Sequence, residues 1–243
     1  MLNIEILGAA SGWLAVNKPS GVSAHNDQGQ DLLAIAIALL EQRPELKLQT
    51  GFTSAFAPSP VHRLDRETSG VVLIATTASA ASFLGQAIEN RKVKKLYRAI
   101  LRAPFMESSG TWSEPLSDRA EGRKNPQGTS SERKPCATAF QVLGQNAYFS
   151  CVEFDLLTGR QHQIRRHAVL NRHQVVGDER YGDPRYVKQM ENRYGLTRLY
   201  LHASKLVFPN PQLSEGSLSE IELDCPPPPE FAALIEQSSG SVA

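Results

Sequence analysis

Hydrophobic and polar positions follow mostly strand-like patterns along this chain. Ile4–Leu7 and Trp13–Val16 predict two short strands joined by a glycine-containing turn. Residues 71–76 (VVLIAT) are continuously apolar and β-branched, which is typical of a strand buried on both faces. Alternation of apolar and polar residues predicts further strands at 95–102, 137–143, 148–157, 199–208 and 218–223.

Fewer segments have a helical pattern. Asp31 is a suitable N-cap for a helix over 32–42 that ends before Pro44, and residues 44–60 are expected to form a loop. Further helices are predicted at 79–90, at 161–172 and from Pro229 onward. Because strands outnumber helices and often follow one another directly, the pattern predicts an α+β fold on a mainly antiparallel sheet. No linker or repeat divides the chain, so one domain over 1–243 is expected.

Residues 117–135 contain no large apolar side chain and no periodicity. This composition predicts a surface loop that stays mobile unless a partner orders it.

Charge is unevenly distributed. The 26 basic and 25 acidic residues give a net charge of only +1. Residues 58–205 nevertheless carry a net +9, and the two ends together carry −8. A basic middle attracts polyanions. We therefore expect its side chains to converge on one cleft, with the acidic ends on the back of the sheet.

Several classes of protein are excluded or disfavoured. The three cysteines have no paired spacing, no signal peptide is evident, and the longest apolar run is too short to span a membrane. No P-loop, dinucleotide or zinc-protease motif is present. His162 and His167 are five residues apart with no acid nearby, so no metal site is expected. These features predict a cytoplasmic protein.

The segment 62–70 (HRLDRETSG) precedes the predicted buried strand. Its turn-forming residues are explained by local structure alone. A second interpretation is chemical: Asp65 lies between Arg63 and Arg66, which would keep its carboxylate ionised and able to act as a nucleophile or electrostatic stabiliser.

Two further segments are basic. Residues 158–173 contain four arginines, three histidines and no acid, which suits an anion unless the side chains are simply solvated. Residues 91–102 contain six basic side chains around Tyr97, which suits phosphate contacts and stacking on an unpaired base. A solvated edge strand explains the second segment almost as well.

Taken together, five segments in order resemble the RluA family of RNA pseudouridine synthases. Residues 62–70 match its catalytic motif throughout. The other matches are 13–21 (WLAVNKPSG, followed by His25), 95–99 (KLYRA), 134–138 (KPCAT), and 158–167 with the later pairs 177–178 and 181–182.

The resemblance implies roles for individual residues in an isomerisation of uridine to pseudouridine that needs no cofactor. Asp65 would drive cleavage of the glycosidic bond, Tyr97 would help to remove the proton from carbon 5, and Arg165 would pair with the aspartate. Arg63 would fill the space left by the flipped base, and Ile164 would lie under that base. Further contacts to RNA are expected from His62, Arg160, His162 and Arg166.

The resemblance has two departures. Residues 172–174 are Arg-His-Gln where many members have Gly-His-Pro, and no separate N-terminal RNA-binding domain is expected, since the first motif begins near residue 12. Residues 165–183 and 194–204 look most like the TruC branch, which implies a tRNA substrate slightly more than large-subunit rRNA. The enzyme is expected to act as a monomer on a structured stem-loop.

Two alternatives stay open. The chain could be an RNA-binding module or chaperone that keeps the fold without catalysis, although such a protein would not need Asp65, Tyr97 and Arg165. A carboxylate-dependent hydrolase is disfavoured because no second acid is placed for general acid/base chemistry.

Overall fold

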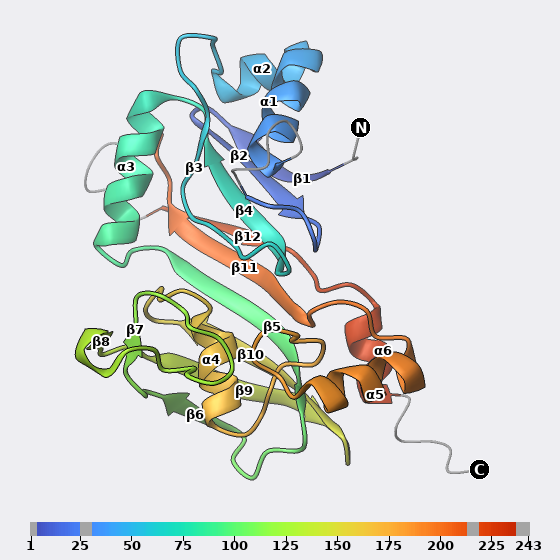
Figure 1. Cartoon of the computed structure of the whole chain (residues 1–243). Coiled ribbons are helices and arrows are strands. Elements are labelled where there is room, and N and C mark those ends of the chain that lie inside the picture. Colours follow the sequence, from blue (N-terminus) through green and yellow to red (C-terminus); the bar gives the residue numbers. More distant parts are fainter. Residues whose placement is uncertain (1–3, 25–30, 213–218, 237–243) are drawn as a thin grey trace. The chain divides into compact units, whose positions relative to one another are not determined.

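The computed structural model describes residues 4–24, 31–212 and 219–236. The chain forms two compact units (Figure 1). The first comprises Met1–Lys95 and Ala203–Pro226, and the second comprises Leu96–His202 and Pro227–Ala243. His25 of the first motif and the beginning of the strand expected at 218–223 lie outside the described residues.

The sheet of the first unit is built mostly from antiparallel pairs. Strand order runs β1-β2-β4-β11, β12 pairs with β11, and β3 pairs with β4. These strands are β1 (Glu5–Ala10), β2 (Trp13–Lys18), β3 (Ser59–Pro60), β4 (Ser69–Ala75), β11 (Leu201–Pro209) and β12 (Glu220–Asp224).

Every residue of β4 is buried, as its apolar run predicts. Gly70 near its start has φ +116°, and a Cβ there would lie 2.3 Å from the carbonyl oxygen of Ala203 in β11. Only glycine allows the backbones of β4 and β11 to approach this closely. The glycine that ends the segment 62–70 is therefore required by the sheet.

In its described residues the first unit has helices α1 (Leu32–Gln42), α2 (Pro44–Thr50) and α3 (Ala78–Glu89). The carboxylate of Asp31 accepts from the backbone N–H of Ala34 at 2.9 Å, so the predicted N-cap is confirmed. The prediction of a loop over residues 44–60 is wrong for residues 44–50, which form α2. Pro44 ends α1 but also begins α2, because proline at the first helical position has no intrahelical N–H to lose.

The described part of the second unit contains another antiparallel sheet segment and the helices α4, α5 and α6. Its strand order is β5-β10-β9-β6. Helix α4 packs against β9, and α6 packs against β10 (Figure 1). The elements are β5 (Lys94–Arg102, from Leu96 onward in this unit), β6 (Ser109–Trp112), β9 (Thr138–Gln145), β10 (Phe149–Leu156), α4 (Gln163–Leu170), α5 (Pro184–Tyr194) and α6 (Glu230–Glu236).

Residues 117–135 are more structured than the sequence suggested. Strand β7 (Leu116–Ser117) pairs with β8 (Arg133–Lys134), and a 3₁₀ turn, η1 (Ser130–Glu132), precedes β8. These short elements at the two ends of the stretch were not predicted, whereas residues 118–129 between them form the predicted loop. Hydrogen bonds from polar side chains to the backbone stabilise this stretch in place of an apolar core. The pattern of apolar and polar residues does not reveal such bonds.

The α+β class and the mainly antiparallel sheet are confirmed. Among the described helices, none combines the length and apolar character needed to cross a membrane.

Candidate active site

Asp65 lies in the turn between β3 and β4. The backbone N–H of Thr68 donates to the carbonyl oxygen of Asp65 at 3.1 Å, which closes this turn. Asp65 is partly exposed and Arg63 beside it is exposed, whereas Leu64 is buried. Leu64 thus anchors the turn in the core while its two charged neighbours remain accessible.

The first sequence motif fixes the position of this turn. Lys18, at the end of β2, is fully buried, and its Nζ donates to the carbonyl oxygens of Pro19, Val22 and Arg66 at 2.8–3.0 Å. A buried ammonium is tolerated when its donors are satisfied in this way. Lys18 therefore joins the motif at 13–21 to the turn that carries Asp65.

Backbone and side-chain bonds reinforce this link. The N–H of Gly21 donates to the carbonyl oxygen of Arg66 at 2.8 Å, and the Nε of Arg66 donates to the carbonyl oxygen of Gly21 at 2.9 Å. The hydroxyl of Ser20 donates to the carbonyl oxygen of Glu67 at 2.6 Å. With the bond from Lys18, four hydrogen bonds hold residues 66–67, directly after Asp65.

His62 supports the same turn. Its Nε2 accepts from the backbone N–H of Leu73 at 3.2 Å, which ties the turn to β4. Burial, with a smaller contribution from the nearby charge of Lys95, lowers the pKa of His62 to about 3. A neutral histidine that bonds to the backbone is better suited to holding the turn than to attracting phosphate.

In the second unit, Tyr97 lies on β5 opposite Phe154 of β10 and is only 6% exposed. Ile164, in the first turn of α4, is 4% exposed. Both residues are packed side chains of this unit.

Helix α4 starts later than the sequence predicts, because His162 adopts φ +53°, in the left-handed region. The side chain of Gln163 then organises the helix start. Its Oε1 accepts from the hydroxyl of Thr158 and the N–H of Arg160 at 2.8 and 3.0 Å. Its Nε2 donates to the carbonyl oxygen of Ala137 at 2.9 Å and to the hydroxyl of Thr138 at 2.8 Å.

Arg165 forms a buried, bidentate ion pair with Asp178. Its Nε and Nη2 donate to the two carboxylate oxygens at 2.9 and 2.8 Å, and the side chains are 3% and 1% exposed. Asp178 also accepts from the N–H groups of Arg180 and Tyr181. Because a bidentate pair fixes both direction and distance, Asp178 orients the guanidinium of Arg165.

The ring of Tyr181 connects this pair to the start of α4. The guanidinium of Arg165 lies 5.4 Å from the centre of the ring, and Nδ1 of His162 lies 2.8 Å from the hydroxyl. Burial raises the pKa of Tyr181, so its hydroxyl stays protonated at neutral pH. His162 and Arg165 thus share one hydrogen-bonded cluster.

Two other predicted residues have different surroundings. Arg160 forms an ion pair with Asp118, which also contacts Lys134 at 2.6 Å. Arg166 is fully buried and bonds to backbone carbonyl oxygens. Its guanidinium is not exposed here, so the structure offers no support for the expected direct contact between Arg166 and RNA.

The structure thus places the predicted residues in two sets. The first unit holds Asp65, Arg63 and His62, and the second holds Tyr97, Arg160, His162, Ile164, Arg165 and Arg166. Sequence reasoning gave no role to Lys18, Gln163 or Asp178, although all three fall within segments that resemble family motifs. Over the described ranges, no group of three histidine, cysteine or acidic side chains could hold a metal.

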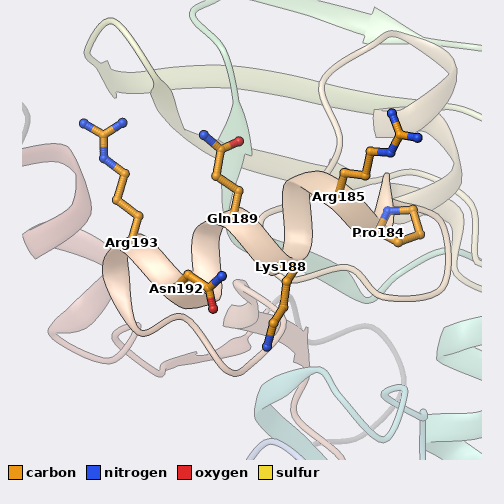
Figure 2. Close-up of a pocket in the computed structure, with 6 residues that line it drawn as sticks. All are labelled: Pro184, Arg185, Lys188, Gln189, Asn192 and Arg193. Atoms are coloured by element: carbon orange, nitrogen blue, oxygen red, sulfur yellow. The ribbon is translucent and has the colours of Figure 1, made fainter.

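A separate pocket lies along the exposed side of α5. Figure 2 shows that its lining comes from this helix alone, with the residues Pro184, Arg185, Lys188, Gln189, Asn192 and Arg193. None of the predicted site residues lines it. It offers cations and amides but no carboxylate or nucleophile, so it does not suit bond cleavage.

Comparison with known proteins shows to which family this chain belongs. The sequence model of the RNA pseudouridylate synthases matches residues 12–169, which include the turn of Asp65, the strand of Tyr97 and most of α4. The chain belongs to this family, and the predicted resemblance is confirmed.

Among curated relatives, the chain is similar to the ribosomal large subunit pseudouridine synthase C of Pasteurella multocida, with 32% identity over 99% of this chain and 71% of the relative. The enzyme of the same name from Escherichia coli K12 is 33% identical over 87% of this chain. The chain covers 64% of the length of that relative.

Two solved human structures are similar as well. RNA Pseudouridylate Synthase Domain Containing 1 has a TM-score of 0.71 and 28% identity, over 96% of this chain and 86% of that one. RNA Pseudouridylate Synthase Domain Containing 4 also has a TM-score of 0.71, with 26% identity over 94% of this chain and 90% of that one.

Proposed function

We propose that this protein converts a uridine of large-subunit ribosomal RNA to pseudouridine, with Asp65 as the catalytic carboxylate. The observation that carries the proposal is the position of Asp65. It lies partly exposed in a turn that residues 13–21 hold with four hydrogen bonds, inside the segment that matches the family. A carboxylate placed so firmly is suited to a reaction that depends on orientation.

The proposed reaction rearranges bonds without changing the composition of the RNA. The bond between N1 of uracil and C1′ of ribose breaks, the base turns, and a bond forms between C5 and C1′. The proton leaves C5 and a proton is added at N1, so no oxidant, reductant or cofactor is consumed. Asp65 would act at the sugar, either by attack on C1′ or by starting an elimination.

The other residues would bind and orient the flipped uridine. An enzyme that acts on a base must first take it out of the stack, which costs a few kcal/mol. We propose that Arg63 fills the vacated space, that Ile164 contacts the base, and that Tyr97 assists removal of the proton from C5. Arg165, oriented by Asp178, would stabilise the charge of the aspartate.

Contacts to the surrounding RNA follow from accessibility. Arg160 is partly exposed and could exchange Asp118 for a phosphate. His162 is also partly exposed, at the start of α4. We expect the enzyme to act in the cytoplasm as a monomer.

Large-subunit rRNA is proposed over tRNA because the curated relatives above are named for the large ribosomal subunit. Those names do not support the slight preference for tRNA expected from residues 165–183 and 194–204. The similarity covers nearly the whole chain for the Pasteurella multocida relative.

Mapping pseudouridine in cellular RNA tests the substrate. A strain that lacks the gene should lose pseudouridine at one or more positions of large-subunit rRNA, and a plasmid copy should restore them. Loss confined to tRNA would contradict the choice of rRNA but leave the reaction intact. Unchanged modification of all RNA, together with no activity of the purified protein, would contradict the proposed function.

A further inference from the structure

The guanidinium of Arg166 is buried with every N–H donor engaged. Arginine has five such donors. Its Nη1 donates to the carbonyl oxygens of Ser117 and Gln161 at 2.9 and 3.1 Å. Its Nη2 donates to the hydroxyl of Ser117 and the carbonyl oxygen of Gln127 at 3.2 and 2.9 Å, and its Nε donates to the carbonyl oxygen of Pro126.

Four of these five acceptors, all except the carbonyl oxygen of Gln161, lie at the two ends of one segment, residues 118–129. Ser117 precedes the segment, whereas Pro126 and Gln127 lie near its end. Arg166 therefore closes the base of this segment from the side of α4. The N–H of Ser117 also donates to the carbonyl oxygen of Gln127 at 2.9 Å, directly across the same base.

The interior of the segment is bonded to itself. The carboxylate of Glu121 accepts from the N–H and hydroxyl of Thr129 at 2.7 and 2.6 Å and from the amide of Asn125 at 2.7 Å. Gly128 has φ +74°, and a Cβ there would lie 1.7 Å from the hydroxyl oxygen of Ser117. The segment is thus closely fitted around its base.

The outer side of the segment is cationic. Arg119, Arg123 and Lys124 are all exposed. The two acidic residues of the segment are exposed as well, but both are already bonded: Glu121 within the segment, and Asp118 with Arg160 and Lys134. The side chains presented to solvent therefore favour a polyanion.

We propose that Arg166 is a positioning residue that holds residues 118–129 in a fixed shape before RNA binds. Arg119, Arg123 and Lys124 would then meet the phosphates of the RNA substrate with no further ordering of the segment. This inference rests on the proposed function for the identity of the polyanion. A segment that is ordered before binding avoids the entropy cost of ordering on the RNA. Because the three cations are exposed, their contribution should depend on salt.

The test compares Arg166→Lys with a variant in which Arg119, Arg123 and Lys124 are all changed to glutamine. Lysine keeps the positive charge but has three donors in place of five and no planar fork. Arg185→Gln, which removes an exposed arginine of α5, is the matched control for loss of surface charge. Gly128→Ala disturbs the same base through Ser117, without changing Arg166, and serves if Arg166→Lys does not fold.

Steady-state kinetics, with rRNA fragments as substrate, should show KM raised about tenfold by Arg166→Lys, with kcat within about twofold of the parent enzyme. The triple variant should raise KM at least as much, and it should lower the slope of log affinity against log salt by about 2 to 3. Adding Arg166→Lys to the triple variant should change KM by less than about twofold, because the two changes remove the same contact. Arg185→Gln should leave KM within about twofold of the parent.

Hydrogen exchange supplies a readout that needs no activity. Backbone amides at 118–129 should exchange at least about tenfold faster in Arg166→Lys or Gly128→Ala, while those of β9 and β10 stay protected. Three results would each overturn the proposal. Exchange at 118–129 could be unchanged, or the KM increases of Arg166→Lys and the triple variant could multiply in the combined variant. The third is an effect of Arg166→Lys on kcat alone. A parent enzyme that isomerises no RNA would instead refute the proposed function, and the exchange data would still decide the role of Arg166.

Discussion

The Nζ of Lys18 lies 3.0 Å from the carbonyl oxygen of Arg66, 48 positions later in the sequence. This bond joins the end of β2 to the turn that carries Asp65. Two further carbonyl oxygens, of Pro19 and Val22, depend on the same ammonium. The first motif of the chain therefore helps to build the turn that carries Asp65.

Replacement of Lys18 by methionine should destabilise the protein by about 1 to 3 kcal/mol, because the part-buried carbonyl oxygens of Pro19 and Val22 lose this donor. Urea unfolding followed by circular dichroism measures this loss. Lys92→Met, at an exposed position, is the control and should change the free energy of unfolding by less than about 0.5 kcal/mol. Equal stability of the two variants would show that Lys18 does not support the turn.

The Asp178→Asn variant should lose about 3 to 5 kcal/mol of stability, because it replaces the carboxylate of a buried, bidentate ion pair with a neutral amide. Glu179→Gln changes the neighbouring, exposed acid and is the matched control. Thermal unfolding distinguishes the two. A variant Asp178→Asn as stable as Glu179→Gln would contradict the assigned role of the ion pair.

His62 makes stability depend on pH. Its pKa is about 3 in the folded state and 6.5 as the ordinary value, so between these limits the unfolded chain binds the additional proton. Stability should therefore fall as pH decreases from 6.5 toward 3, by about 1 to 2 kcal/mol between pH 7 and pH 5. Burial also lowers the pKa of His167, which acts in the same direction.

Comparison of the parent protein with His62→Gln isolates the contribution of His62. Glutamine has no group that titrates in this range and can still accept from the N–H of Leu73. Urea unfolding at pH 7.5 and pH 5.0 should show a smaller loss for the variant. An identical loss in both proteins would mean that His62 does not titrate as described.

Tyr97→Phe tests the proposed proton transfer. Removal of the hydroxyl should lower kcat by roughly 10²- to 10⁴-fold, the range typical of a general acid or base. Release of tritium from RNA labelled at C5 of uridine measures the step directly. Tyr148→Phe is the control, because Tyr148 is 47% exposed, and this variant should retain full activity. Normal tritium release by Tyr97→Phe would remove Tyr97 from the mechanism.

Strong periodicity and capping made parts of the fold predictable. Helix α1 has the predicted limits because Asp31 caps it and Pro44 ends it. Helix α5 was not predicted, since its sequence PRYVKQMENRY buries only Tyr186 and Met190 and is otherwise polar. Helix α4 begins at Gln163, later than predicted, because His162 has a left-handed backbone, which no local residue pattern indicated.

In the candidate site, too, some residues could be predicted from the sequence and others could not. Asp65, Tyr97 and Arg165 could be named because whole motifs surround them in the sequence. The roles of Lys18 and Arg166 could not be inferred, because both bind backbone carbonyl oxygens, and such acceptors leave no mark on the sequence. Asp178 was within a matched segment, but its pairing with Arg165 required the three-dimensional structure.

Asp65→Asn is the sharpest test of the proposal that Asp65 is the catalytic carboxylate. This change keeps the size of the side chain, so the turn held by Lys18 and Ser20 should form normally. Glu89→Gln, which neutralises an exposed acid at the end of α3, is the matched control. Both variants should first be shown to bind the rRNA fragment with affinities within about threefold of the parent.

Pseudouridine in that fragment should then be quantified after incubation with each protein. We expect Asp65→Asn to form pseudouridine at least roughly 10⁴-fold more slowly than the parent, as for loss of a group central to bond cleavage, and Glu89→Gln to match the parent. Pseudouridine formation by Asp65→Asn at the rate of the parent enzyme would show that Asp65 is not the catalytic carboxylate.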